Sequence, residues 1–99
     1  MPIRQFPVRT GRKTITNTAT QLTAVDAEGQ RGVQIVAGSA NADTVYVGES
    51  SAVTADGGDT TDGYPLAAGE TLVLPTLRAD ELYLIADSSG SNKVWWILI

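Results

Sequence analysis

The sequence predicts a single all-β domain, an antiparallel β-sandwich or jelly-roll that follows an extended N-terminal arm. Three observations favour this class. The 99 residues suit one domain, and no stretch repeats apolar residues at helical spacing over three turns. Short alternating segments rich in Val, Ile and Thr recur along the chain. Without crossover helices such strands pair mostly antiparallel, and two sheets packed face to face would bury their apolar residues.

The expected strands are separated by turns rich in Gly, Ser, Asn and Asp. The first strand, over 14–18, is rich in Thr, and 21–25 can continue it. Where the spacing is regular, strands start roughly 10–13 residues apart, as in a sandwich or barrel. The remaining strands are expected over 33–37, 44–47, 71–74, 82–85 and 93–99. The segment 48–69 has the composition of a loop, and a loop of this length is usually functional or flexible.

The composition disfavours an enzyme. The chain contains no Cys and no His, which removes thiolate chemistry, disulfides, the commonest zinc ligands and the commonest general base. Asp80 and Glu81 are adjacent, so on a strand they would point to opposite faces and could not act as a glycosidase pair. We therefore expect neither catalytic residues nor a cofactor.

One glycine-rich segment carries three carboxylates, Asp56, Asp59 and Asp62. Calcium prefers oxygen ligands on flexible loops. The spacing differs from a calcium loop, in which ligands occupy alternate positions. These residues are weak metal candidates, and a solvated acidic loop without metal is the stronger interpretation.

Charge is distributed unevenly. The net charge is −4, and no acidic residue occurs before Asp26. Residues 1–12 therefore form a basic arm ahead of a domain over 13–99. Pro2 and Pro7 favour extended backbone in this arm. It can be a solvated tail or can dock on an acidic protein surface; nucleic acid is not expected, because the acidic body would repel phosphate. The candidate binding residues are Arg4, Arg9, Arg12 and Lys13.

The C-terminal segment is apolar on both faces. Val94, Trp96 and Leu98 share one face of the expected strand, and the other face carries Trp95, Ile97 and Ile99. A surface strand of a monomer should have one polar face, so we expect the second set to form a subunit interface. The alternative is that the arm or the long loop covers it. This run is too short for a membrane helix, which needs about 20 residues, and no signal peptide is evident; we expect no membrane partner.

Three segments in order resemble small virion proteins of tailed bacteriophages: Asn41–Gly48 (NADTVYVG), Gly63–Leu72 (GYPLAAGETL) and Leu82–Ile85 (LYLI). The resemblance covers roughly residues 31–99. It implies a β-sandwich or jelly-roll that decorates or cements the capsid, binds the major capsid protein and often forms a homotrimer. The expected location is the virion surface, after synthesis in the host cytoplasm. The alternatives are a tail or head-fibre adaptor and a carbohydrate-binding β-sandwich module.

Overall fold

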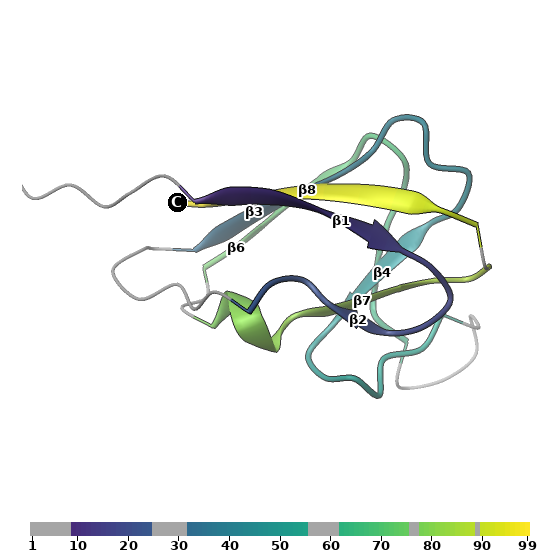
Figure 1. The fold of residues 1–99 in the computed structure, drawn as a ribbon, viewed down its shortest axis with the longest axis horizontal. Coiled ribbons are helices and arrows are strands. Elements are labelled where there is room, and N and C mark those ends of the chain that lie inside the picture. Colours follow the sequence, from purple (N-terminus) through teal and green to yellow (C-terminus); the bar gives the residue numbers. More distant parts are fainter. Residues whose placement is uncertain (1–8, 25–31, 56–61, 76–77, 89) are drawn as a thin grey trace, which may run out of the picture.

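The computed structural model describes residues 9–24, 32–55, 62–75, 78–88 and 90–99, and it confirms an all-β fold of two antiparallel sheets (Figure 1). Sheet A has the order β1-β8-β3-β6, and sheet B has the order β2-β7-β4-β5. Eight strands arranged in two packed sheets in this order form a jelly roll. The strands are β1 (Thr10–Ile15), β2 (Thr20–Gln21), β3 (Val33–Ala37), β4 (Val45–Gly48), β5 (Tyr64–Leu66), β6 (Thr71–Leu74), β7 (Tyr83–Ala86) and β8 (Asn92–Leu98).

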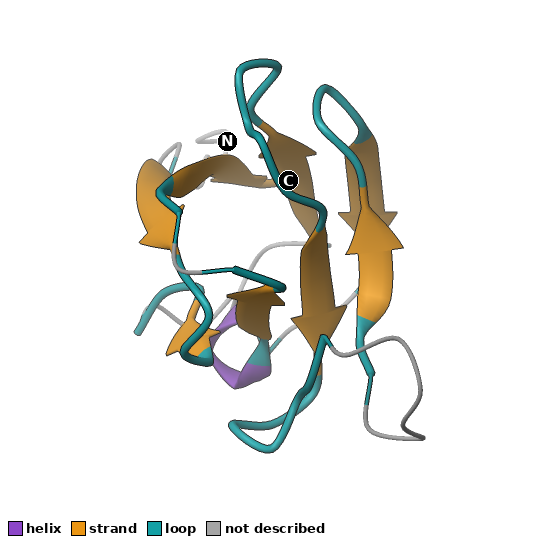
Figure 2. Cartoon of the chain, turned by 90° about the vertical axis from the view of Figure 1, so that its right-hand side faces the viewer, coloured by secondary structure: helices purple, strands orange, loops and turns teal. Residues whose placement is uncertain are grey.

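The core lies between the two layers, which Figure 2 shows from the side. The longer strands contribute alternate residues to it, as the period of two in the sequence requires. On β3 the residues Val33, Ile35 and Ala37 are fully buried, and on β7 Leu84 and Ala86 are buried. The apolar alternation that predicted the strands is therefore the pattern that fills the space between the sheets.

The N-terminal part differs from the expectation. A strand runs over Thr10–Ile15 at the edge of sheet A, and the chain then crosses to sheet B, where Thr20–Gln21 pairs with β7. The expected boundary between arm and domain, after residue 12, therefore falls inside a paired strand. Sequence patterning missed residues 10–13 of β1 because they are mostly polar. Pairing with β8 fixes them, and this pairing extends to a hydrogen bond from Leu98 N to Arg9 O of 2.9 Å.

The expected loop over 48–69 also contains a strand. Residues 64–66 form β5, which pairs with β4 at the edge of sheet B and places Pro65 opposite Tyr46. Proline lacks a backbone donor, and an edge strand tolerates that. The three residues are too few to show alternation, which is why the sequence indicated a loop.

A polar network ties together the loops at one end of the sandwich. The Asn92 side chain is fully buried; its Nδ2 donates to Asp43 Oδ2 at 3.0 Å, and its Oδ1 accepts from Asp43 N at 3.1 Å. Ser88 Oγ also donates to Asp43 Oδ2, at 2.6 Å. These hydrogen bonds, from Ser88 first and then Asn92, lower the pKa of Asp43. The network fixes the start of β8 against the loop between β3 and β4.

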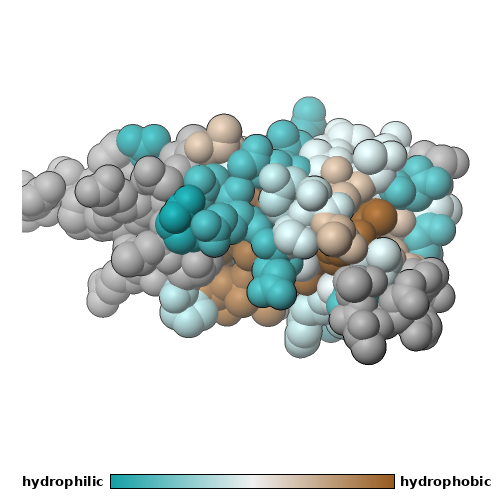
Figure 3. Space-filling view, turned by 90° about the horizontal axis from the view of Figure 1, so that it is seen from below, coloured by the Kyte–Doolittle hydropathy of each residue, from teal (hydrophilic) through white to brown (hydrophobic). Residues whose placement is uncertain are grey.

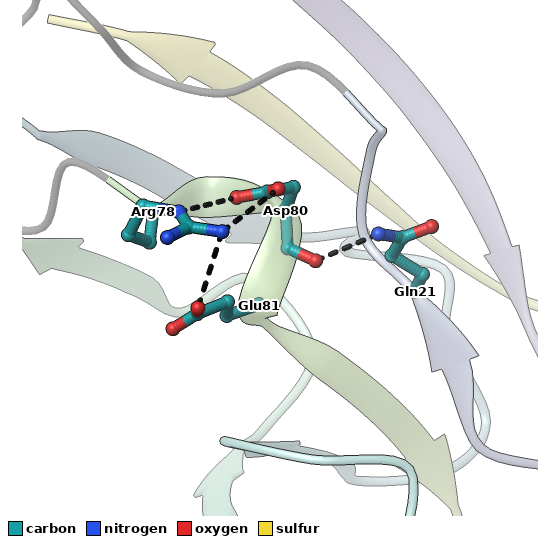
Figure 4. A network of polar contacts seen from close by, with 4 residues as sticks. All are labelled: Gln21, Arg78, Asp80 and Glu81. Atoms are coloured by element: carbon teal, nitrogen blue, oxygen red, sulfur yellow. Dashed lines mark hydrogen bonds and ion pairs between the residues drawn. The ribbon is translucent and has the colours of Figure 1, made fainter.

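A second network, at the 3₁₀ turn over Ala79–Glu81, attaches β2 to the entry of β7 (Figure 4). Gln21 Nε2 donates to Asp80 O at 2.7 Å, and Arg78 pairs with Asp80 and Glu81, each at 3.2 Å. Exposed pairs of this kind contribute about 0–1 kcal/mol each. Within the described ranges, no helix is long and apolar enough to cross a membrane.

Candidate functional site

The outer face of sheet A carries an apolar surface, which we call the Trp95 face. Its members are Arg12, Val36, Val73, Lys93, Trp95, Ile97 and Ile99. The pairing register places Arg12, Trp95, Val36 and Thr71 in one row across the sheet, and Thr10, Ile97, Gln34 and Val73 in the next. Directly paired residues project from the same face of a sheet. The two rows therefore bring together side chains from four strands.

The alternation of β8 decides which residues face outward. Val94, Trp96 and Leu98 are buried, whereas the exposed fraction is 43% for Trp95 and 46% for Ile99. Ile97 is half-buried. Val73, on β6, is 53% exposed. Of the four large hydrophobic residues exposed in the described part of the chain, three therefore lie on the Trp95 face.

Of the four basic residues predicted to bind a partner, the three that the structure describes do not form one patch. Arg4 lies outside the described residues. Arg9 is exposed just before β1, and Arg12 projects beside Trp95 from the adjacent strand. Lys13 is half-buried and, because neighbouring residues of a strand alternate, points to the other side of β1. Arg12 and Lys93 give the Trp95 face a positive charge, and none of its members is acidic.

A shallow hollow of about 270 Å³ adjoins Trp95. Its walls include Ser39, Asn41, Ser91 and Lys93. The Asn41 side chain is locked by two hydrogen bonds to the Lys93 backbone, of 2.9 and 2.8 Å. The indole lies close over Gly38, where an added Cβ would be 2.9 Å from Trp95 Cζ3. The fold thus brings polar groups to an exposed tryptophan whose own strand segment offers few.

A larger open cavity, which we call the edge groove, lies between β5 and β6, the edge strands of the two sheets. Its volume is about 610 Å³, and its apolar lining includes Val47, Val53, Tyr64, Leu72, Leu74 and Leu82. Glu49 and Asp62 are the acidic residues of the described lining, and no basic residue occurs there. Sequence analysis missed the groove because its walls come from four separate segments of the chain. The available signal was the run Leu72–Leu74, which is apolar on both faces of an expected strand.

The carboxylates considered for metal binding are only partly described. Asp56 and Asp59 lie outside the described residues. Asp62 forms an isolated bridge with Thr54 and accepts a hydrogen bond from Thr54 Oγ1 at 2.7 Å. In the described ranges, no three His, Cys, Asp or Glu side chains gather in a way that could hold a metal ion.

Apolar patches interrupt the hydrophilic surface on the side of the molecule that Figure 3 shows. Comparison of the chain with protein-family models, curated proteins and solved structures gives no match.

Proposed function

We propose that this protein is a structural protein of a tailed-phage head, a decoration or cement protein that binds the assembled capsid across junctions between major capsid subunits. The observation that carries the proposal is the uncovered Trp95 face: Val73, Trp95 and Ile99 are each more than two-fifths exposed on one side of one sheet. Contiguous exposed apolar surface marks an interaction site. The jelly roll adds fold-level analogy, because viral capsid and lectin domains often use it, although a fold alone does not specify function.

In the proposed mechanism, copies associate through the Trp95 face, with Trp95, Ile97 and Ile99 at the contact and three copies expected from the family resemblance. Burial contributes about 25 cal/mol for each Å² of apolar surface removed from water. Arg9, which is exposed and lies outside the Trp95 face, meets acidic groups on the major capsid protein, where guanidinium and carboxylate can pair through two parallel hydrogen bonds. A ligand that binds only the assembled shell stabilises that shell by linkage, and many copies acting together need only weak individual contacts.

Self-association is tested by sedimentation equilibrium at tens of micromolar, roughly the range in which weak assembly is detectable. The wild type is expected to be oligomeric, and Trp95→Asp and Val73→Asp are expected to be monomeric because each places a charge in the contact. Thr14→Asp is the matched control, since Thr14 is also exposed on an outer position of sheet A but at its polar edge. A monomeric wild type, or an oligomer that resists both substitutions, contradicts the proposed interface.

Capsid binding is tested by co-sedimentation with phage heads stripped of this protein. The wild type is expected to pellet with the heads and raise the temperature at which they release DNA. Arg9→Glu is expected to weaken binding without unfolding the protein, because Arg9 is exposed and lies outside the Trp95 face. Failure to pellet with heads, combined with binding to purified tails or fibres, would identify the chain as an adaptor instead.

The hollow beside Trp95 favours a second candidate function, saccharide binding. An indole face held in place next to hydroxyl, ammonium and amide groups matches a site that combines an apolar wall with a few polar groups. A glycan array followed by calorimetry tests this candidate. Binding that Trp95→Ala removes would support it, and a blank array would exclude the glycans tested.

A further inference from the structure

The edge groove exposes apolar side chains that a sandwich normally buries. Leu72 and Leu74 project from β6 toward the core side of sheet A, yet each stays half-buried because β5 does not reach across to close that edge. Tyr64, on the other wall, is 61% exposed. An opening of about 610 Å³ lies within the range of pockets that bind ligands, roughly 300–1,000 Å³. The groove therefore has the size and lining of a binding site for an apolar group.

The charge of the groove indicates what kind of segment it accepts. Glu49 and Asp62 stand among its described lining residues without any basic residue. A complementary ligand is apolar with positive charge alongside. Residues 1–8, which lie outside the described part of the chain, have this composition: Ile3, Phe6 and Val8 with Arg4, and no acidic residue. Phe6 is the only phenylalanine in the chain.

Chain length decides which copy the segment can reach. The register places Arg9, Leu98, Val33 and Leu74 in one row across sheet A, so Arg9 and the groove wall at Leu74 are three strand spacings apart, or about 14 Å. Phe6 precedes Arg9 by three residues, which span at most about 10 Å when fully extended. Even if residues 6–9 ran straight across the sheet, the Phe6 backbone would stop about 4 Å short of Leu74, so only a fully extended segment could bring the ring to the groove of its own subunit. The groove of a neighbouring subunit imposes no such constraint.

We infer that the edge groove binds the N-terminal segment 1–8 of a second copy of this chain, with Phe6 among Leu72, Leu74 and Tyr64 and Arg4 beside Glu49. This inference rests on the self-association in the proposed function and adds a second link between copies. Pro2 and Pro7 reduce the conformational freedom that the segment loses on binding. Arg9 remains on the surface of its own domain, available to the capsid.

The first experiment measures binding of a fluorescent peptide of residues 1–12 to the protein that lacks residues 1–8, by fluorescence anisotropy. Saturable binding is expected, and Phe6→Ser in the peptide is expected to weaken it roughly tenfold or more, since burial of the ring is lost. Glu49→Lys in the protein is expected to weaken it about 5- to 10-fold. The matched control is Glu81→Lys, which makes the same charge change at an exposed residue outside the groove lining and should leave the affinity unchanged.

The second experiment compares the solution masses of the full chain, its Phe6→Ser variant and the truncated protein. A loss of mass in both variants, while circular dichroism stays that of the wild type, supports exchange between copies. No peptide binding, or equal weakening by Glu49→Lys and Glu81→Lys, overturns the site. Peptide binding to the truncated protein together with a monomeric full chain overturns the assignment to a second copy. Neither experiment contains capsids, so a failure of capsid co-sedimentation is a separate result.

Discussion

Replacement of Gly11 by alanine tests whether β1 packs against Trp96 of β8 as closely as the structure shows. Gly11 lies opposite Trp96, and an added Cβ would stand 2.7 Å from the indole Cζ2 and 2.8 Å from Cε2 and Nε1. Carbon atoms in contact prefer about 3.5–4.0 Å, so three ring atoms would be overlapped by most of an ångström. Trp96 is 8% exposed and forms part of the core, so the ring has little room to move away.

Overpacking of this kind costs about 1–3 kcal/mol, and the general gain from replacing glycine in a strand offsets about 0.5–1 kcal/mol of it. We expect Gly11→Ala to lose about 1–2 kcal/mol in urea unfolding, or about 5–15 °C in Tm for a domain of this size. In the background of Trp96→Phe, whose ring is smaller, the loss should shrink, which a double-mutant cycle measures. A neutral or stabilising Gly11→Ala, or an equal loss in both backgrounds, would show that the edge strand does not pack against Trp96 as described.

Three further predictions concern stability in urea unfolding. Ser88 and Asn92 lower the pKa of Asp43, so its contribution to the free energy of unfolding is complete above the unfolded pKa of about 3.9 and is lost as the pH falls through the lower folded pKa. Asp43→Asn should therefore lose less stability on acidification than the wild type. Parallel curves of unfolding free energy against pH for the two proteins would contradict this. Leu84→Ala, at a fully buried site, should cost about 2–5 kcal/mol, and a cost below 1 kcal/mol would mean the site is not packed. Gly69→Ala should cost about 1 kcal/mol because Gly69 has a φ of 84°, which a residue with a Cβ adopts only with strain. No atom lies within 4 Å of the added Cβ, so the cost measures the backbone conformation alone. A stabilised variant would refute the left-handed conformation at this position.

The Trp95 face and the edge groove, the two surfaces proposed for contact between copies, carry opposite charges. The Trp95 face carries Arg12 and Lys93 without an acidic member, whereas the described lining of the edge groove carries Glu49 and Asp62 without a basic one. In the inferred exchange, Arg4 of one copy would meet Glu49 of another, and complementary potentials of this kind help to fix which surfaces meet. Contacts between two different surfaces generate closed rings when the rotation closes, which is compatible with a trimer built by exchange of N-terminal segments.

The candidate site was partly readable from the sequence. The alternation of β8 alone placed Trp95, Ile97 and Ile99 on the side opposite Val94, Trp96 and Leu98, because side chains of a strand alternate strictly between its faces. Which neighbours join them was not readable. Val36 and Val73 reach the same surface through strand order and register, which pair segments tens of residues apart.

The fold class and most of the strands follow from the sequence alone, since a period of two in apolar residues is a local property of each segment. The other elements depend on contacts between distant segments. Polar β1 is a strand because β8 offers it hydrogen-bond partners, and Tyr64–Leu66 is a strand because β4 does. The edge groove exists because two edge strands end near each other without pairing. These features depend on backbone pairing between distant segments, and hydrogen bonds of the backbone leave no mark on the side chains from which a sequence is read.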